Sequence, residues 1–371
     1  MTSNKIIYFP GLNGMRAIAA IAVVISHITI SLKDFGLDPY IFGSFNDGKP
    51  KGYILGGYGV SIFFVLSGFL ITYLLKSEKD AHSIDIKKFY MRRILRIWPL
   101  YYLYLIVALI TILSFGFDLN IKSLFLYTFY AANIPFILSI GLPFVGHYWS
   151  LGVEEQFYLF WPWFIKKTNR LILPIFIMII VLIGVKSSLH LFYPNSLFES
   201  IIHVTRFHCM MIGALGAILL KNENTLFQRL MDNKLIQSIC WIIMILVAIN
   251  QFHFISFIDN EVISVVTLVL IVGQIRIKSR ILNLENNFFD FLGKISYGIY
   301  VIHPLLIFFF SKIFIGIEIN IYFKYITVYT SIISTTILLS YISFECFEKS
   351  FLKLKKNFVV IKSTATKSDF N

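Results

Sequence analysis

Long apolar stretches separated by short polar and basic segments run along the whole chain. Ten of these stretches are candidates for membrane-spanning helices, which typically hold about 20 mostly apolar residues. They cover residues 15–32, 54–75, 97–114, 149–165, 171–188, 206–220, 235–253, 261–275, 291–311 and 324–346. No alternating segments of the transmembrane β-barrel type occur. The pattern predicts an all-α, polytopic membrane protein with about ten transmembrane helices.

Composition and charge agree with this class of protein. Of the 371 residues, 57% are hydrophobic and 14% charged, whereas a soluble domain needs more polar surface. With the N-terminus inside and alternating spans, inner segments hold 25 of the 33 Lys and Arg residues. Cytoplasmic segments collect such residues, so both termini are predicted to be cytoplasmic. The same rule accounts for the net charge of +13 without nucleic-acid binding.

Residues 121–140 do not fit the alternation. They are apolar enough to span, but a span here would place the basic segments 166–170 and 276–280 outside. We therefore expect a re-entrant or interfacial segment on the outer side. Residues 1–350 are predicted to form one membrane domain, and residues 351–371 a disordered, polar cytoplasmic tail.

The first predicted span carries two ionisable residues, Arg16 and His27. They are eleven positions apart, which places them about 20° apart around a helix and about 16 Å apart along it. Ionisable groups inside a span usually face a cavity or a partner, which makes His27 a candidate catalytic residue. In the alternative interpretation, Arg16 reaches the inner headgroups and His27 hydrogen-bonds a neighbouring helix.

Two adjacent carboxylates, Glu154 and Glu155, follow the start of the fourth predicted span. They should lie about 8 Å below the outer surface, at a depth similar to that of His27. A carboxylate that orients an imidazole is the arrangement of a general base. The alternative is a buried ion pair or hydrogen bond that only joins helices. His147 and Trp149, just before this couplet, are candidate contacts of an acceptor.

The ninth predicted span contains Ser296, Tyr300 and His303. The serine and the histidine are seven residues apart and share a helix face, with the tyrosine close by. All three are candidates for substrate binding in the same cavity. His303 can equally be a core histidine before a proline kink.

An arginine cluster, Arg92, Arg93 and Arg96, marks the inner end of the third predicted span. Helical spacing places the guanidinium groups on one side, and arginine forks suit phosphate groups. Ordinary anchoring at the cytoplasmic interface is the alternative. Ser67 in the second span has a sufficient role in close helix contact, and it is also a candidate contact of a phosphorylated donor. We expect no metal cofactor.

Five motifs together resemble the acyltransferase-3 family of integral membrane acyltransferases. They are Arg16 with His27, FFVLSGFLIT at 63–72, RRILRIWPLYY at 92–102, WSLGVEEQFYLFWP at 149–162 and SYGIYVIHP at 296–304. They follow the family's order over nearly the whole chain. One departure is the closing Glu-Arg/Lys-Pro stretch of the family, which reads Glu348-Lys349-Ser350 here.

The resemblance implies an enzyme of the bacterial cytoplasmic (inner) membrane that uses cytoplasmic acyl-CoA, most often acetyl-CoA. It implies a catalytic His27 and functional importance for Arg16, Arg93, Arg96 and the Glu154/Glu155 couplet. Acceptors in the family include O-antigen, exopolysaccharide and peptidoglycan. Some members carry an extracytoplasmic hydrolase-like domain, and a relay through such a domain would need a separate partner protein here.

The predicted function is therefore O-acyl transfer from acyl-CoA to a hydroxyl of an extracytoplasmic or lipid-linked glycan. In this hypothesis His27 takes the hydroxyl proton, a glutamate orients His27, and arginines hold the CoA phosphates. One rival is a transporter of a lipid-linked sugar with a histidine–glutamate proton relay. Another is a structural subunit of a glycan-assembly complex. CoA binding would distinguish the enzyme from the transporter.

Overall fold

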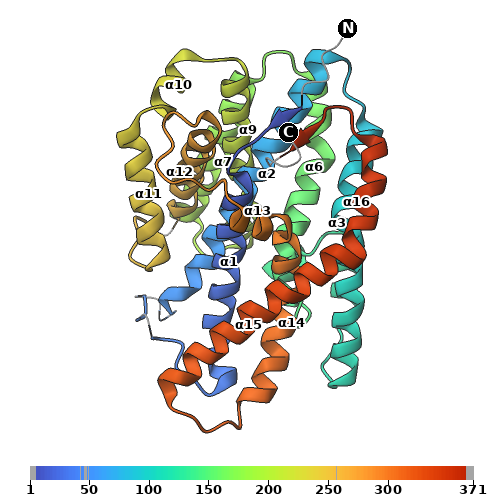
Figure 1. The fold of residues 1–371 in the computed structure, drawn as a ribbon, viewed down its shortest axis with the longest axis vertical. Helices are drawn as coiled ribbons and strands as arrows, with labels where there is room; N and C mark the ends of the chain where they lie inside the picture. Colours follow the sequence, from blue (N-terminus) through green and yellow to red (C-terminus); the bar gives the residue numbers. More distant parts are fainter. Residues whose placement is uncertain (1–5, 42, 46–47, 49, 256, 365–371) are drawn as a thin grey trace.

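The computed structural model describes residues 6–41, 43–45, 48, 50–255 and 257–364, and this part of the chain is mostly helical (Figure 1). Two short strands, β1 (Ile7–Tyr8) and β2 (Ser363–Thr364), pair in parallel. The predicted all-α, polytopic fold class is confirmed.

The helices follow one another with short connections. They are α1 (Leu12–Ile30), α2 (Ile54–Ala81), α3 (Ile86–Ser114), α4 (Ile121–Thr128), α5 (Asn133–Ile137), α6 (Trp149–Lys167), α7 (Ile172–Phe192), α8 (Leu197–Thr205), α9 (Phe207–Lys221), α10 (Thr225–Met231), α11 (Lys234–Ala248), α12 (Asp259–Arg276), α13 (Asn287–Lys294), α14 (Ser296–Phe314), α15 (Ile321–Ser343) and α16 (Lys349–Lys355). A π-helical turn, Phe344–Glu348, joins α15 to α16. Every predicted span overlaps one of these helices, and the span 291–311 overlaps two of them, α13 and α14.

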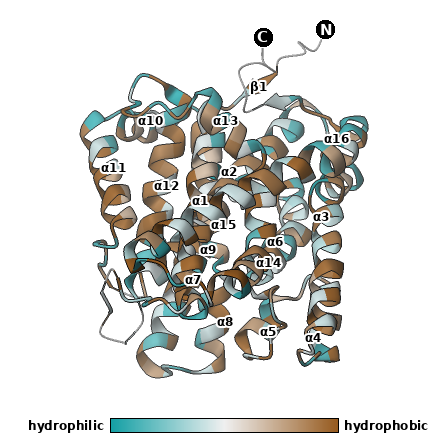
Figure 2. Ribbon diagram, turned by 60° about the horizontal axis from the view of Figure 1, so that its bottom comes forward, coloured by the Kyte–Doolittle hydropathy of each residue, from teal (hydrophilic) through white to brown (hydrophobic). Residues whose placement is uncertain are grey.

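Seven helical segments of the described chain are long and apolar enough to cross a membrane, and the bent pair α10–α11 raises this number to eight. Helices α6 and α12 are not among them, because any stretch of 18 residues in either helix contains at least three charged residues. The figure of ten crossings therefore stays a prediction. The helices consist largely of apolar residues (Figure 2), and many of their large apolar side chains are exposed. In α7, for example, only Ile175, Ile179 and Lys186 are buried.

Helix α2 lies between α1 and α9, and glycines allow these helices to approach closely. A Cβ atom at Gly68 would overlap the backbone of Met210 in α9, and one at Gly213 would overlap the carbonyl oxygen of Val65 in α2. Close backbone approach of this kind is typical of helix pairs in membranes. This packing places α2 in the centre of the three helices, and residues of α2 line both cavities described below.

The segment 121–140 folds as the short helices α4 and α5 with a turn between them. Neither helix is long enough to cross a membrane, in agreement with the non-spanning prediction. Its placement on the outer side stays a prediction.

The expectation of a disordered tail does not hold for residues 351–364. Helix α16 and a 3₁₀ turn, Lys356–Phe358, continue the chain past residue 350, and β2 then pairs with β1. The Phe358 carbonyl accepts a hydrogen bond from Arg92 Nη1 at 2.9 Å, which ties this segment to α3. Residues 365–371 lie outside the described residues. The first and last strands therefore lie side by side at one end of the helical bundle (Figure 1).

Candidate active site

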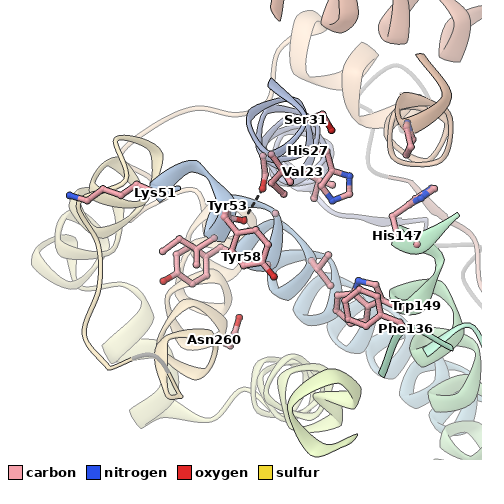
Figure 3. Close-up of a pocket in the computed structure, with 18 of the residues that line it drawn as sticks. Val23, His27, Ser31, Lys51, Tyr53, Tyr58, Phe136, His147, Trp149 and Asn260 are labelled. Carbon is pink, nitrogen blue, oxygen red and sulfur yellow. Dashed lines mark hydrogen bonds between the residues drawn. The ribbon is translucent and has the colours of Figure 1, made fainter. Parts of the chain in front are cut away.

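Two of the cavities formed by the described residues are lined by residues of α2 and make up the candidate site. The larger one, of about 1150 Å³, is lined by His27, His147, Trp149 and Arg206, among others, and is called here the histidine cavity (Figure 3). The smaller one, of about 240 Å³, contains several basic side chains and is called the arginine cavity. Val60 and Tyr300 line both cavities, so the two spaces adjoin at these residues.

The pairing of α1 with α2 sets the depth of each cavity. Gly56 of α2 lies against His27 of α1, with the ideal Cβ position 3.9 Å from His27 Cδ2, and Gly59 lies against Ala19 and Val23. The helices are therefore antiparallel. Ser67 follows Gly56 by eleven residues, which is about 16 Å along the helix, and the same distance separates Arg16 from His27. His27 and Gly56 therefore lie at one end of the site, and Arg16 and Ser67 lie at the other end, about 16 Å away along the helices.

The arginine cavity concentrates positive charge. Arg16, Arg93, Arg96 and Lys355 all line it, and Glu154 is the one carboxylate among its lining residues. Arg16 donates to Asn13 Oδ1 at 3.0 Å, while the buried Nε atom of Arg93 has no hydrogen-bond partner in the described chain. Four cations around one carboxylate favour an anionic ligand with several charges.

Glu154 belongs to the arginine cavity and not to the surroundings of His27. It accepts hydrogen bonds from Ser67 Oγ at 2.8 Å and Tyr158 OH at 3.1 Å. The prediction that Glu154 lies at the depth of His27 is wrong, because its partner Ser67 is about three helical turns away from the His27 level.

His27 has a histidine as its hydrogen-bond partner. His27 Nδ1 lies 2.8 Å from His303 Nε2, and His303 Nδ1 lies 3.1 Å from the carbonyl oxygen of Ile299. A carbonyl only accepts, so His303 Nδ1 carries a proton, and a neutral His303 then accepts at Nε2. His27 must donate from Nδ1, which leaves the lone pair on its Nε2. His27 lines the histidine cavity, so this tautomer makes it suitable as a base there.

The other predicted acceptor contacts divide between the two cavities. His147 and Trp149 line the histidine cavity, and both ring nitrogens of the buried His147 lack a partner within the described residues. Tyr300 OH lies 2.5 Å from Ser150 Oγ and 2.8 Å from the His147 carbonyl, at the junction of the cavities. Ser296 lines the arginine cavity instead. His303 is fully buried behind His27 and lines neither cavity.

Besides His303, two further predicted site residues lie outside both cavities. Arg92 pairs with the buried Glu78 at 3.2 Å and with the C-terminal segment, so its charge is already compensated. Glu155 Oε2 is 3.5 Å from Trp98 Nε1, and neither cavity is lined by Glu155. Arg93, Arg96 and Ser67 do line the arginine cavity, and their contact with a phosphorylated donor stays a prediction.

Three residues gain importance only from the structure. Lys355 lies in the segment expected to be disordered, and Arg206 was not singled out at all. His303 was predicted as a substrate contact or a core histidine, and its contact with His27 was not foreseen. The basic run after residue 348 and the arginine at the start of an apolar stretch were the available signals. No group of three or more His, Cys, Asp or Glu side chains in the described ranges is arranged to hold a metal ion.

Comparison with known proteins identifies the family. A model named "Acyltransferase domain" matches residues 9–345. The chain is 27% identical over 378 residues to "Putative O-acetyltransferase SACOL0978" of Staphylococcus aureus (strain COL), covering 94% of this chain and 58% of that protein. It is 34% identical over 170 residues to "Peptidoglycan O-acetyltransferase OatA" of Listeria monocytogenes, covering 43% of this chain and 24% of that protein.

The chain thus spans little more than half the length of the first of these relatives. No solved structure matches it. Because the family model covers about nine-tenths of the chain, the protein belongs to the acyltransferase-3 family of membrane acyltransferases.

Proposed function

We propose that this protein is an acyl-CoA-dependent O-acyltransferase that moves an acetyl group, from the cytoplasmic side, to a hydroxyl group of an extracytoplasmic glycan. The observation that carries the proposal is the position of His27. Its Nε2 lone pair is available on the wall of a large cavity that adjoins a strongly basic one. O-acetyltransferase is also the activity in the names of both relatives reported above.

In this proposal the acyl-CoA donor occupies the arginine cavity. Arg93, Arg96 and Lys355 bind its phosphate groups, because guanidinium and ammonium groups form strong charge-assisted bonds with phosphate oxygens. The cavity adjoins the histidine cavity at Val60 and Tyr300, so a narrow pantetheine arm placed there brings the thioester toward His27. The paired strands β1 and β2 lie on this side, which we assign to the cytoplasm.

The glycan acceptor occupies the histidine cavity. His27 Nε2 takes the proton of the acceptor hydroxyl while the oxygen attacks the thioester carbonyl carbon. The C–S bond breaks, and the CoA sulfur receives the proton from His27, which gives an ester and free CoA. His303 is a positioning residue that holds the His27 tautomer, and His147 forms part of the cavity wall.

The test uses the purified chain in lipid nanodiscs with radiolabelled acetyl-CoA and peptide-free peptidoglycan strands as the acceptor. We expect the wild type to transfer label, and His27→Ala to bind acetyl-CoA normally but to lose transfer by at least about a hundredfold. His82→Ala, a change at an exposed histidine outside both cavities, is the matched control. Wild-type turnover in His27→Ala would remove His27 from the mechanism.

A further inference from the structure

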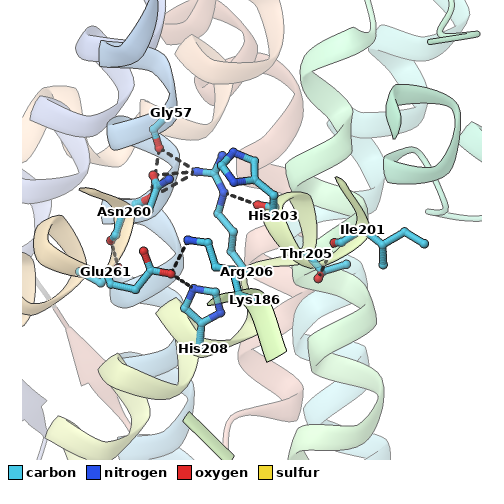
Figure 4. A network of polar contacts seen from close by, with 11 residues as sticks. Gly57, Lys186, Ile201, His203, Thr205, Arg206, His208, Asn260 and Glu261 are labelled. Carbon is cyan, nitrogen blue, oxygen red and sulfur yellow. Dashed lines mark hydrogen bonds and ion pairs between the residues drawn. The ribbon is translucent and has the colours of Figure 1, made fainter. Parts of the chain in front are cut away.

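Arg206 is a buried cation on the wall of the histidine cavity. It is 7% exposed and lies between α8 and α9 with a left-handed backbone, φ 41° and ψ 35°. Such a conformation is unfavourable for a residue with a Cβ atom and persists only where the surroundings hold it. The backbone break directs this side chain toward α2 and α12 (Figure 4).

Neutral groups fix the guanidinium in place. Nε donates to the His203 carbonyl at 2.8 Å, and Nη1 donates to Asn260 Oδ1 at 3.0 Å and to the Gly57 carbonyl at 3.3 Å. These acceptors orient the group but carry no negative charge. The terminal Nη2 has no hydrogen bond to any described residue, so it is the atom left to contact the contents of the cavity.

The carboxylates nearby are occupied by other partners. Glu261, next to Asn260 in sequence, is 2.6 Å from Lys186 Nζ and 2.7 Å from His208 Nε2 (Figure 4). Asp259, which lines the cavity, accepts hydrogen bonds from Tyr58 OH and from the backbone amides of residues 254 and 255. Arg206 has no ion pair in the described part of the chain. A buried charge without a counter-ion is costly, and a ligand that supplies one is correspondingly favoured.

Arg206 and the proposed base, His27, contact neighbouring residues of α2 and line the same cavity. The Gly57 carbonyl that contacts Arg206 directly follows Gly56, which lies against the His27 ring. The guanidinium lies 5.4 Å from the ring centroid of Trp149, and the Phe136 ring stacks on Trp149 with 5.4 Å between the ring centroids. An aromatic surface beside a cation is a suitable contact for a sugar ring that carries an acidic substituent.

We infer that Arg206 makes the histidine cavity selective for an acceptor glycan that bears an anionic group, a carboxylate or a phosphate, next to the hydroxyl that is modified. Arg206 Nη2 donates to that anion, and the Trp149 ring packs against the neighbouring sugar. The inference rests on the proposed function, because it assigns the histidine cavity to the acceptor.

The test measures glycan binding to the full chain in nanodiscs by titration calorimetry. One pair of probes is peptide-free peptidoglycan strands with free lactyl carboxylates and the same strands with these carboxylates amidated. A second pair is a tetrasaccharide with and without a glycerol phosphate substituent. We expect the wild type to bind the charged member of at least one pair about tenfold more tightly or better. The pair that shows the preference identifies the anion as carboxylate or phosphate.

Two variants assign the preference to Arg206. Arg206→Gln should abolish it, and Asn260→Asp should do the same by placing a carboxylate against the guanidinium without changing the side-chain volume. Lys51→Gln, which removes another cation of the same cavity, is the control and should keep the preference. Equal wild-type affinity for charged and neutral probes, or a preference that survives in both Arg206→Gln and Asn260→Asp, would overturn the inference.

Transfer from labelled acetyl-CoA, measured in parallel, separates this inference from the proposed function. Transfer without a charge preference would refute the inference alone. A charge preference that depends on Arg206, without any transfer, would refute the acyltransferase proposal and leave the anion site standing.

Discussion

The hydrogen bond between His27 and His303 predicts a specific kinetic effect. In His303→Phe a ring of similar size fills the buried position, but His27 Nδ1–H loses its acceptor at 2.8 Å. An unsatisfied buried donor costs about 1–3 kcal/mol, and each 1.36 kcal/mol in the barrier is about tenfold in rate. We therefore expect kcat for acetyl transfer to fall by about 5- to 150-fold. The KM for acetyl-CoA should not change, because His303 does not line the arginine cavity.

The assay is steady-state transfer of label from acetyl-CoA to peptide-free peptidoglycan strands, with both substrates varied. His303→Gln is the rescue variant, since its amide oxygen can accept from Nδ1–H and should restore part of kcat. His82→Phe introduces the same side chain at an exposed position and should behave as wild type. A His303→Phe enzyme with unchanged kcat, or with a loss confined to the KM for acetyl-CoA, would refute the role assigned to His303.

Other predictions concern the donor site and the helix packing. Arg93→Gln should raise the KM for acetyl-CoA about tenfold or more, because it removes a charge-assisted contact. Arg92→Gln should leave this KM unchanged, because Arg92 is paired with Glu78. Equal KM values in the two variants would contradict this assignment. Lys355→Gln should also raise that KM, and donor binding unaffected by the change would exclude the C-terminal segment from the donor site. Gly213→Ala should destabilise the fold by about 1–3 kcal/mol, seen as a lower thermal midpoint in detergent, because the new methyl group meets the backbone of α2. Gly184→Ala, with open space around it, should not lower the midpoint, and an equal loss in both variants would argue against close α2–α9 packing.

The helices were predictable because their apolar stretches have the length that a bilayer requires, but their ends were less so. Helix α3 begins at Ile86, eleven residues before the predicted span, because the Asp85 side chain accepts from the Lys88 amide and starts the helix in a polar region. Residues after 350 looked disordered because they are polar and basic. Within the described residues, 351–364 are ordered, and β2 pairs with β1 from the other end of the chain.

Within the candidate site, the spacing of residues along one helix could be used for prediction, whereas the contacts between different helices could not be predicted. Spacing of eleven residues on α1 placed Arg16 and His27 at two different depths. The short spacings at the start of α3 grouped Arg92, Arg93 and Arg96, of which Arg93 and Arg96 line the arginine cavity. It could not show which side chain from another helix faces His27. Depth estimates favoured a glutamate, yet the α1–α2 register and the Ser67–Glu154 hydrogen bond put that carboxylate about 16 Å away along α2. Which helices adjoin is a tertiary property, and a single-helix pattern does not contain it.

The most direct test of the two-cavity account is an experimental structure of the protein with a non-hydrolysable thioether analogue of acetyl-CoA. We predict that the phosphate groups lie against Arg93, Arg96 and Lys355, and that the acyl end passes Val60 and Tyr300 toward His27. An analogue bound elsewhere, or bound in the arginine cavity with its acyl end directed away from His27, would contradict the account.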